Sequence, residues 1–312
     1  MSSTFDLSDA ALVGQLNPSL LSLEYLEYLD LRGNSLEGPN LWIPEFLGSM
    51  KNLRHLDLSV SLLNSATFRT ATTRPIMGAK SYLDMSYVNL RAVVDWPHVL
   101  NRLPSLQAIK LDGCSLQSAN QSLKHQNLTN LVQLHLSYNR FDHLVASCWF
   151  WNITNIESLS LFGTYLYGQF PTELGHMTSL KDIAFGKNDN RAKMQVDMKD
   201  LCALERLWLE GLSLGNAAEL LENLPQCPSN KLQIIDLSNN YLAGDIYLGN
   251  TENIFTNLEL VNLSNNHIRG VISGGIGNST FLWMFDLSNN DINGALPQGI
   301  ASCPSLGESG PF

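Results

Sequence analysis

Apolar residues recur along the chain in one frame, L-x-x-L-x-L-x-x-N-x-L. The clearest copies of this frame read LEYLDLRGNSLEG, LVQLHLSYNRF, LQIIDLSNNYLAG, LELVNLSNNHIRG and LWMFDLSNNDING. Twelve registers of the frame follow one another at spacings of 24 to 28 residues. A fixed period of this length is the signature of a repeat array, in which each repeat packs only on its neighbours.

The L-x-L core of each frame alternates with a period of two, which predicts a short strand with its leucines on one face. Stacking such strands in parallel buries a continuous leucine core, while the bulkier remainder of each repeat returns on the opposite side. We therefore predict an α/β leucine-rich repeat solenoid of about twelve repeats. The solenoid is curved, with a parallel β-sheet on its concave face and an irregular, 3-10 or short helical convex face.

An asparagine follows six of the twelve predicted strands, where the chain turns inward. An Asn amide both donates and accepts, so it can satisfy backbone groups within and between repeats. Cys114 and Thr164 could do part of this, whereas Val88 and Leu212 cannot, and we expect weaker turns at those two residues. The position is occupied in turn by Ala10, Asn34, Ser61, Val88, Cys114, Asn139, Thr164, Asn188, Leu212, Asn240, Asn266 and Asn290.

The composition suits a folded array. Of 312 residues, 44% are hydrophobic and only 15% are charged, which is enough apolar material for a large core. Length alone suggests two domains, but arrays grow in one dimension. We therefore predict a single array over residues 1–312 without recognisable terminal caps. Residues 60–80 fit the frame worst, and we expect an irregular segment there.

Charge and hydropathy exclude several classes of partner. The net charge is −10 and no cluster of Lys and Arg is present, so nucleic acid and anionic membranes are poor partners. No stretch approaches the roughly 18 consecutive apolar residues of a transmembrane helix. The N-terminus lacks a basic segment followed by an apolar run, so no signal peptide is recognised. We expect no direct membrane contact by this chain.

No pattern in the chain points to catalysis. The glycines of SGGIGNS (273–279) fall in a convex turn and do not open a helix after a nucleotide-fold strand. None of the five cysteines forms C-x-x-C, and no histidines share the spacing of a metal motif. We expect a protein that is not an enzyme and that has no cofactor and no metal site.

The cysteines and sequons leave alternatives open. Cys202 and Cys227 lie one repeat apart, each just before the next strand, so they form either a disulfide or two buried thiols. Cys114 takes an Asn position, and Cys148 and Cys303 are interpreted as core residues. Five N-x-S/T sequons are candidate glycosylation sites, and a glycan on the fourth of them would obstruct the concave face. The sequons begin at Asn120, Asn127, Asn152, Asn262 and Asn278.

Several repeats continue as G-x-(I/L/F)-P-x-x-(L/I)-G, as in LYGQFPTELGHMTSL (166–180) and INGALPQGIASCPSL (292–306). With this continuation the chain resembles the ectodomains of plant leucine-rich repeat receptors. The stretches YLDMSYVNLRAVVDWPHVLNRLPSL and LLENLPQCPSNKLQIIDLSNNYLAG resemble receptor-like proteins of grasses related to Cf-type resistance proteins and fungal xylanase receptors. The resemblance covers roughly residues 5–306.

The resemblance implies an extracellular region at the plasma membrane that recognises a protein, peptide or glycan ligand in defence or developmental signalling, with a co-receptor kinase as a further partner. The signal peptide, caps and transmembrane helix of that family are not found, so we interpret the chain as a fragment of a longer receptor. Two alternatives remain, a secreted inhibitor that resembles polygalacturonase-inhibiting proteins and a truncated nonfunctional paralogue.

The middle residue of L-x-L faces away from the core in every repeat, and this column locates a candidate binding surface. It stays near Asp or Asn in repeats two to four and ten to twelve, and departs from them in repeats five to nine. Trp, Tyr and Arg dominate binding hot spots. Drift of the repeats with lateral packing of aromatic residues is the alternative. The candidate ligand-binding residues are Lys110, His135, Tyr138, Phe162, Lys187, Arg206, Trp208 and Glu210.

Overall fold

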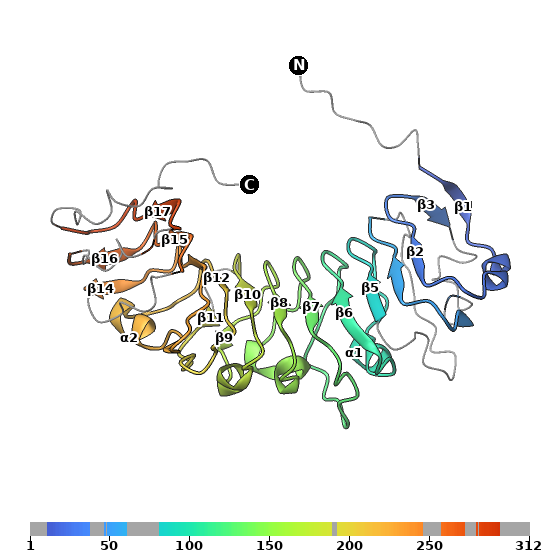
Figure 1. Cartoon of the computed structure of the whole chain (residues 1–312), viewed down its shortest axis with the longest axis horizontal. Helices are drawn as coiled ribbons and strands as arrows, with labels where there is room; N and C mark the ends of the chain where they lie inside the picture. The colour runs from blue at the N-terminus through green and yellow to red at the C-terminus, as the bar shows by residue number, and fades with distance from the viewer. Residues whose placement is uncertain are drawn as a thin grey trace, which may run out of the picture. The chain divides into compact units, whose positions relative to one another are not determined.

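The protein is described from a computed structural model, which describes residues 11–37, 47, 49–60, 81–188, 192–245, 257–271, 279 and 281–293. The chain divides into two compact units, unit 1 (Met1–Phe141) and unit 2 (Asp142–Phe312). The two units are described separately below (Figure 1). Most of the irregular segment predicted at 60–80, as well as Ala10, Asn278 and Cys303, lies outside the described residues.

Each unit is built on a ladder of short parallel strands, one from each repeat (Figure 1). In unit 1 the ladder strands are β2 (Tyr28–Asp30), β4 (His55–Asp57), β5 (Ser81–Asp84), β6 (Leu106–Lys110) and β7 (Gln133–His135). In unit 2 they are β8 (Ser158–Ser160), β10 (Asp182–Phe185), β12 (Arg206–Leu209), β13 (Ile234–Asp236), β15 (Leu260–Asn262) and β17 (Met284–Asp286). The predicted leucine-rich repeat solenoid is therefore confirmed.

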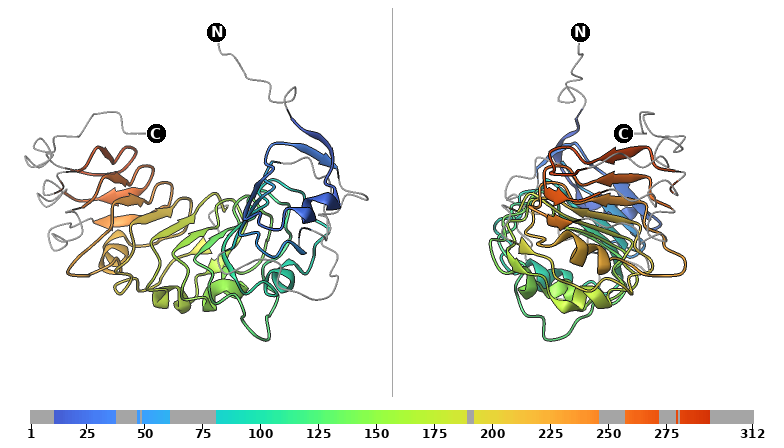
Figure 2. Two further views of the ribbon diagram at one scale, coloured as in Figure 1. Left: turned by 45° about the vertical axis from the view of Figure 1, so that its right-hand side comes forward. Right: turned by 90° about the vertical axis from the view of Figure 1, so that its left-hand side faces the viewer.

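The return side of the repeats carries the remaining elements, on the far side from the ladder strands (Figure 2). Its helices are short: α1 (Trp96–Leu100) in unit 1 and α2 (Ala217–Glu222) in unit 2, with the 3-10 turns η2 (Pro18–Ser22), η4 (Val145–Ser147), η5 (Trp149–Asn152) and η6 (Thr172–His176). Small parallel pairs join β1 (Val13–Gln15) to β3 (Ser35–Glu37), β9 (Gly168–Gln169) to β11 (Ala192–Lys193), and β14 (Ala243–Asp245) to β16 (His267–Arg269). Within the described residues no helix has the length and apolar character needed to cross a membrane.

The predicted count of twelve repeats is somewhat too high. The described residues supply 11 ladder strands, and the first register falls on Ala10, outside them. Several of these strands also lack a completely described return segment. The frame counts every copy of a motif, whereas a turn of the solenoid needs both a paired strand and a return segment.

The core consists of the frame leucines, as the period-two pattern predicts. On β12, Leu207 and Leu209 are fully buried, whereas Arg206 and Trp208, which alternate with them, are partly exposed. Aromatic residues of the return side extend this core in unit 2, where Phe170 packs edge-on against Phe185 with ring centroids 4.8 Å apart. The outward residues of the ladder strands and the turn residues that follow them form what we call the ladder face of each unit.

The asparagine row works as the sequence predicts. The side-chain nitrogen of Asn266 donates to the carbonyl of Leu263 in its own repeat and to that of Leu237 in the preceding one, both at 2.9 Å. Its side-chain oxygen accepts from the backbone N–H groups of Asn240 and Leu242, at 3.0 and 2.9 Å. One buried amide thus satisfies four backbone groups that the inward turn would otherwise leave unpaired.

Cys114 and Thr164 replace asparagine in part, as expected. The Cys114 thiol donates to the carbonyl of Met85 at 3.0 Å, and burial raises its pKa, which keeps its proton in place. The Thr164 hydroxyl donates to the carbonyl of Leu161 at 2.8 Å. Each side chain therefore supplies a donor, but neither supplies all the bonds of an amide.

Val88 and Leu212 have no polar side chain, yet their backbone groups are hydrogen bonded. The N–H of Leu212 donates to the side-chain oxygen of Asn240 in the next repeat, at 2.5 Å. The N–H of Val88 donates to the carbonyl of Met85 at 3.0 Å. Neighbouring residues thus supply the partners that the side chains cannot, which offsets the weakness that we expected at these turns.

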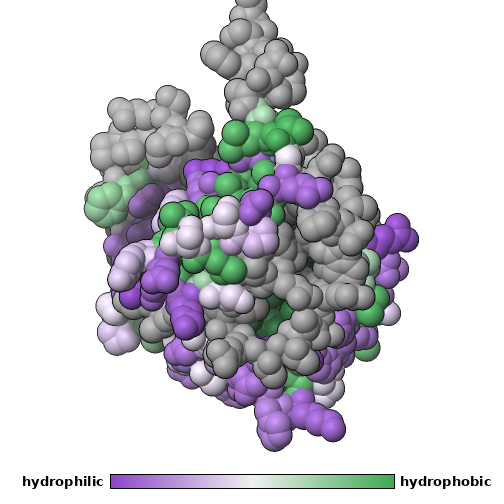
Figure 3. Space-filling model, turned by 90° about the vertical axis from the view of Figure 1, so that its right-hand side faces the viewer, coloured by the Kyte–Doolittle hydropathy of each residue, from purple (hydrophilic) through white to green (hydrophobic). Residues whose placement is uncertain are grey.

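The outer end of unit 1 exposes apolar side chains. Figure 3 looks at this end and shows hydrophobic colour among hydrophilic residues. β2 is the outermost ladder strand described in unit 1, so its repeat lacks one neighbour among the described residues. Whether the whole chain is one array without caps stays a prediction. The exposed apolar residues of this end include Leu12, Val13, Leu21, Leu23 and Tyr25.

Candidate functional site

The predicted site residues of unit 1 lie at the end of its ladder. Lys110 and His135 are the outward residues of β6 and β7, and both are half-buried. Tyr138 lies in the turn directly after β7 and is 53% exposed. The Lys110 ammonium lies 5.5 Å from the centroid of the Tyr82 ring on β5, within the range of a cation–π contact.

The predicted site residues of unit 2 form two groups. Lys187 lies with its ammonium 5.4 Å from the centroid of the Phe162 ring. The Phe162 ring in turn lies flat over Gly186, where any Cβ would clash with it. This close approach explains why glycine replaces the usual serine before the turn in that repeat. The first group therefore consists of Phe162, Gly186 and Lys187, packed against one another.

The second group in unit 2 is on β12. Trp208 is outward and half-buried, in register with Ala184 on β10 and Asp236 on β13. The small side chain of Ala184 leaves room beside the indole ring. The prediction that Trp208 faces away from the core is confirmed, and Arg206, two positions earlier on the strand, shares that face.

The charges beside Trp208 are engaged by neighbouring repeats. The Arg206 Nε lies 2.5 Å from a carboxylate oxygen of Asp182 on β10, and this hydrogen bond raises the pKa of the guanidinium. The Glu210 carboxylate accepts from the side-chain nitrogen of Asn239 at 3.5 Å. Both side chains are held by the ladder, so they present fixed charges beside the indole ring.

The residue type at one turn position is unusual in four repeats. The residue before each Asn position has a positive φ in every described repeat, a conformation that suits Gly or Asn. Most repeats use those residues, but Tyr87, Tyr138 and Lys187 adopt it with φ of 65°, 57° and 49°. Each carries a large exposed side chain in a conformation that costs about 1 kcal/mol relative to glycine. Val60 is the fourth exception.

Sequence reasoning missed a stack of rings on the ladder face of unit 1. Tyr28, His55 and Tyr82 occupy the same position of β2, β4 and β5. Their ring centroids lie 4.0 and 4.3 Å apart, with planes inclined by only 10° and 3°. We call these three residues the aromatic stack. The sequence carries a signal for the stack, because successive members are 27 residues apart. They lie two positions before the middle residue of L-x-L, outside the column from which the site was predicted.

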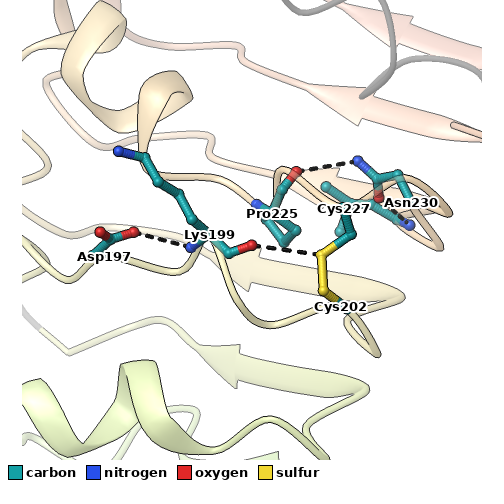
Figure 4. Close-up of a disulfide and its surroundings, with 7 residues drawn as sticks. Asp197, Lys199, Cys202, Pro225, Cys227 and Asn230 are labelled. Atoms are coloured by element: carbon teal, nitrogen blue, oxygen red, sulfur yellow. Dashed lines mark hydrogen bonds between the residues drawn. A yellow bond between two sulfur atoms is a disulfide. The ribbon is translucent and has the colours of Figure 1, made fainter.

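The disulfide of unit 2 joins Cys202 and Cys227, the pair that the repeat spacing favours (Figure 4). Their Cα atoms lie 5.6 Å apart, a usual separation for a disulfide. The sulfur of Cys227 also lies 3.5 Å from the carbonyl oxygen of Lys199. The bond links the return segments of two adjacent repeats. Cys114 and Cys148 are free and buried.

The sequons differ in accessibility. Asn120, Asn127 and Asn152 are exposed on the return side. Asn262 lies in the ladder face, where its side-chain nitrogen donates to Asp236 at 3.0 Å and its oxygen accepts from Ser264. Glycosylation of Asn262 would break the bond to Asp236. Among the residues that the structure describes, no group of three or more His, Cys, Asp or Glu side chains could hold a metal ion.

The repeats and their ladder form a leucine-rich repeat solenoid, and a family model described as Leucine Rich Repeat matches residues 25–50 and 257–279. Receptor-like protein EIX1 of Solanum lycopersicum is 30% identical over 202 residues, which cover 57% of this chain and 19% of that protein. Receptor-like protein EIX2 of the same organism is 27% identical over 201 residues, covering 57% and 20%. The chain therefore spans about a fifth of the length of these relatives.

A solved structure titled "Plant peptide hormone receptor RGFR1 in complex with RGF2" superposes with a TM-score of 0.65 at 26% identity. The match covers 95% of this chain and 45% of that one. The chain thus resembles the ectodomains of plant leucine-rich repeat receptor-like proteins, as the sequence predicted.

Proposed function

We propose that the chain is an extracellular ligand-recognition region of a plant receptor-like protein at the plasma membrane, acting in defence or developmental signalling. Its role is binding rather than catalysis, and a co-receptor kinase transmits the signal. Two similarities support this, one to receptor-like proteins of tomato and one to a receptor whose structure contains a peptide hormone. We favour a peptide or protein ligand over a glycan for the same reason.

The observation that carries the proposal is a strained, exposed side chain at the same turn position in each unit. Tyr138 and Lys187 hold a backbone conformation that consensus repeats assign to Gly or Asn. Neither is needed to close the turn, because Asn239 and Asn265 close it at the equivalent position in later repeats. Side chains retained against a backbone cost are a mark of functional sites. Trp208 adds a large amphipathic ring on a rigid strand, as hot spots do.

Restoring the consensus tests this proposal. Tyr138→Asn and Lys187→Asn remove the side chains and relieve the strain, so we expect unchanged or slightly higher stability. Peptides selected from a random linear library on the wild-type protein serve as the probe, with affinities measured by biolayer interferometry. We expect each substitution, and also Trp208→Ala, to weaken such peptides about tenfold, which corresponds to roughly 1.4 kcal/mol.

Asn265→Gly is the matched control, since it changes the same turn position where the side chain follows the consensus. We expect it to leave affinity unchanged. If peptides bind the three variants as tightly as they bind the wild type, Tyr138, Lys187 and Trp208 are not recognition residues and reflect drift of the repeats.

A further inference from the structure

The ladder face of unit 1 carries a row of carboxylates beside the aromatic stack. Asp30, Asp57 and Asp84 are the outward residues of β2, β4 and β5, in register with one another. Asp57 and Asp84 are only 5% and 8% exposed. Neighbouring strands of a sheet lie about 4.8 Å apart, so these charges are close together. The row therefore concentrates negative charge in a region of low exposure.

Cations lie at the two ends of this row, because Asp84 is in register with Lys110 on β6 and Asp30 neighbours Arg32, whereas none lies beside Asp57 in the middle among the described residues. Asp30 pairs with Arg32 at 3.0 Å. Asp57 accepts one backbone N–H, from Ser59 at 2.9 Å, and within the described residues no Lys or Arg lies within ion-pair distance of it. A mostly buried carboxylate such as Asp57 that lacks a neighbouring cation attracts one strongly, because water screens it poorly.

Asp84 is bound only by hydrogen bonds. It accepts from the N–H of Ser86 at 2.9 Å and from the Tyr82 hydroxyl at 3.0 Å. Burial, followed by the nearby charge of Asp84, raises the pKa of Tyr82, which keeps that phenol neutral and able to donate. Neither bond brings a positive charge to the row.

The aromatic stack already receives a cation at one of its ends and exposes a ring at the other. The Lys110 ammonium already lies over Tyr82, which forms one end. Tyr28 forms the other end and is 57% exposed. His55 lies between the two rings, and burial lowers its pKa, so the stack itself carries no positive charge at neutral pH. A ligand cation would therefore meet ring faces and carboxylates without repulsion from His55.

We propose that the aromatic stack and the row of Asp30, Asp57 and Asp84 bind an extended peptide segment that carries arginine side chains. The planar guanidinium group stacks on aromatic rings and also binds carboxylates through two parallel hydrogen bonds, so it fits both halves of this surface. The inference rests on the proposed function in taking the ligand to be a peptide, but it assigns a surface apart from Tyr138, Lys187 and Trp208.

The test uses two synthetic peptides with the full-length chain. One alternates arginine with glycine; the other replaces each arginine with citrulline, which has nearly the same shape but no charge. Binding is measured by fluorescence anisotropy at near-physiological salt. We expect the arginine peptide to bind at least about tenfold more tightly than the citrulline peptide. Equal affinities of the two peptides overturn the proposal.

Two charge-matched variants locate the site. Asp57→Asn removes one carboxylate but keeps an oxygen to accept from Ser59, so the fold is retained. Asp286→Asn removes one carboxylate at the equivalent position in unit 2, where its oxygen accepts from Ser288. We expect Asp57→Asn to weaken the arginine peptide about tenfold and Asp286→Asn by less than about twofold. Equal losses indicate general attraction to a chain of net charge −10 and overturn the proposal.

Two further variants separate the stack from the charge and this proposal from the previous one. Tyr28→Leu keeps an apolar side chain but removes the exposed ring, and we expect about threefold weaker binding of the arginine peptide. Unchanged binding removes the stack from the proposal. We expect Tyr138→Asn to leave binding of the arginine peptide unchanged, because Tyr138 lies outside the surface formed by the aromatic stack and the row of aspartates. Either proposal can therefore fail without the other.

Discussion

The same strand position carries two different solutions in the two units. In unit 2 the outward residues of β13, β15 and β17 read Asp236, Asn262 and Asp286, and the amide of Asn262 donates to Asp236 at 3.0 Å. In unit 1 the equivalent residues are three aspartates, without an amide between them. The row in unit 2 therefore has an amide donor at its middle residue, whereas Asp57, the middle residue of the row in unit 1, has neither an amide nor a cation as its partner among the described residues.

The difference extends to the residues two positions earlier. Unit 1 places Tyr28, His55 and Tyr82 there, as a stack of rings. Unit 2 places Ile234 and Leu260 there, both nearly buried. An identical consensus residue thus has different surroundings in the two units. A consensus aspartate is therefore not excluded from binding a ligand by being consensus.

The largest expected effect concerns the cross-link that unit 2 has and that the described residues of unit 1 lack. Replacing Cys202 and Cys227 by alanine removes a constraint over 25 residues, which stabilises a fold by about 3 kcal/mol. We expect amide hydrogen exchange to accelerate around β12 and β13 while β4 and β5 keep their protection. Reductant should reproduce the effect in the wild type and do nothing further in the variant. Equal loss in both units would mean that the units unfold together.

The second prediction concerns a substitution that gives the row of unit 2 three aspartates, as in the row of unit 1. Asn262→Asp removes the donor to Asp236 and places a carboxylate between those of Asp236 and Asp286, so we expect a loss of about 2 kcal/mol of unfolding free energy at neutral pH. Urea denaturation measures it. The loss should shrink as pH falls and the carboxylates take up protons. A loss that does not depend on pH would point to packing rather than to charge.

The third prediction makes the reverse change. Asp57→Asn places an amide between Asp30 and Asp84, as in unit 2, and removes repulsion within the row. We expect the protein to become more stable by about 0.5–1 kcal/mol, because like charges in contact are destabilising by such amounts. Asp236→Asn is the comparison, and it should destabilise, because two amides would then face each other where a carboxylate now accepts. If both substitutions destabilise, the row of unit 1 is not under electrostatic strain.

Much of this fold could be predicted from the sequence, because each repeat restates the same physical requirements. The alternation on β12, the asparagine row and the pairing of Cys202 with Cys227 all follow from a fixed period. The direction in which Trp208 faces follows for the same reason. Features that depend on one residue per repeat are therefore visible in one column of the sequence.

The candidate site was predicted less completely, because its features depend on two columns or on lateral contacts. The stack of Tyr28, His55 and Tyr82 lies in a second outward column, two positions before the middle residue of L-x-L. The ion pair of Arg206 with Asp182 depends on side-chain reach between strands, which spacing does not give. The strain at Tyr138 appears only when its φ is compared with that of the glycines and asparagines at the same turn.

The smallest expected effect is a pH dependence that comes from His55 in unit 1. Burial lowers the pKa of His55 in the folded protein below its usual value of about 6.5. The unfolded chain therefore binds a proton more readily than the folded one, and stability falls as pH drops below about 6.5. His55→Phe keeps a flat ring in the stack without titrating. We expect the melting temperature of the wild type to fall relative to that of His55→Phe as pH drops from 7 to 5.

Taking the difference between these two proteins removes the titration of groups that they share, including Asp30, Asp57, Asp84, Tyr28, Tyr82 and Arg32 around the ring. The sign of the result decides a point about the acidic row. Asp57, Asp30 and Asp84 all act to raise the pKa of His55, against burial. If the wild type instead gains stability as pH falls, the carboxylates outweigh burial and the row binds the protein's own imidazolium. The row would then need no ligand cation, and the contrast between the two units would be one of internal pairing only.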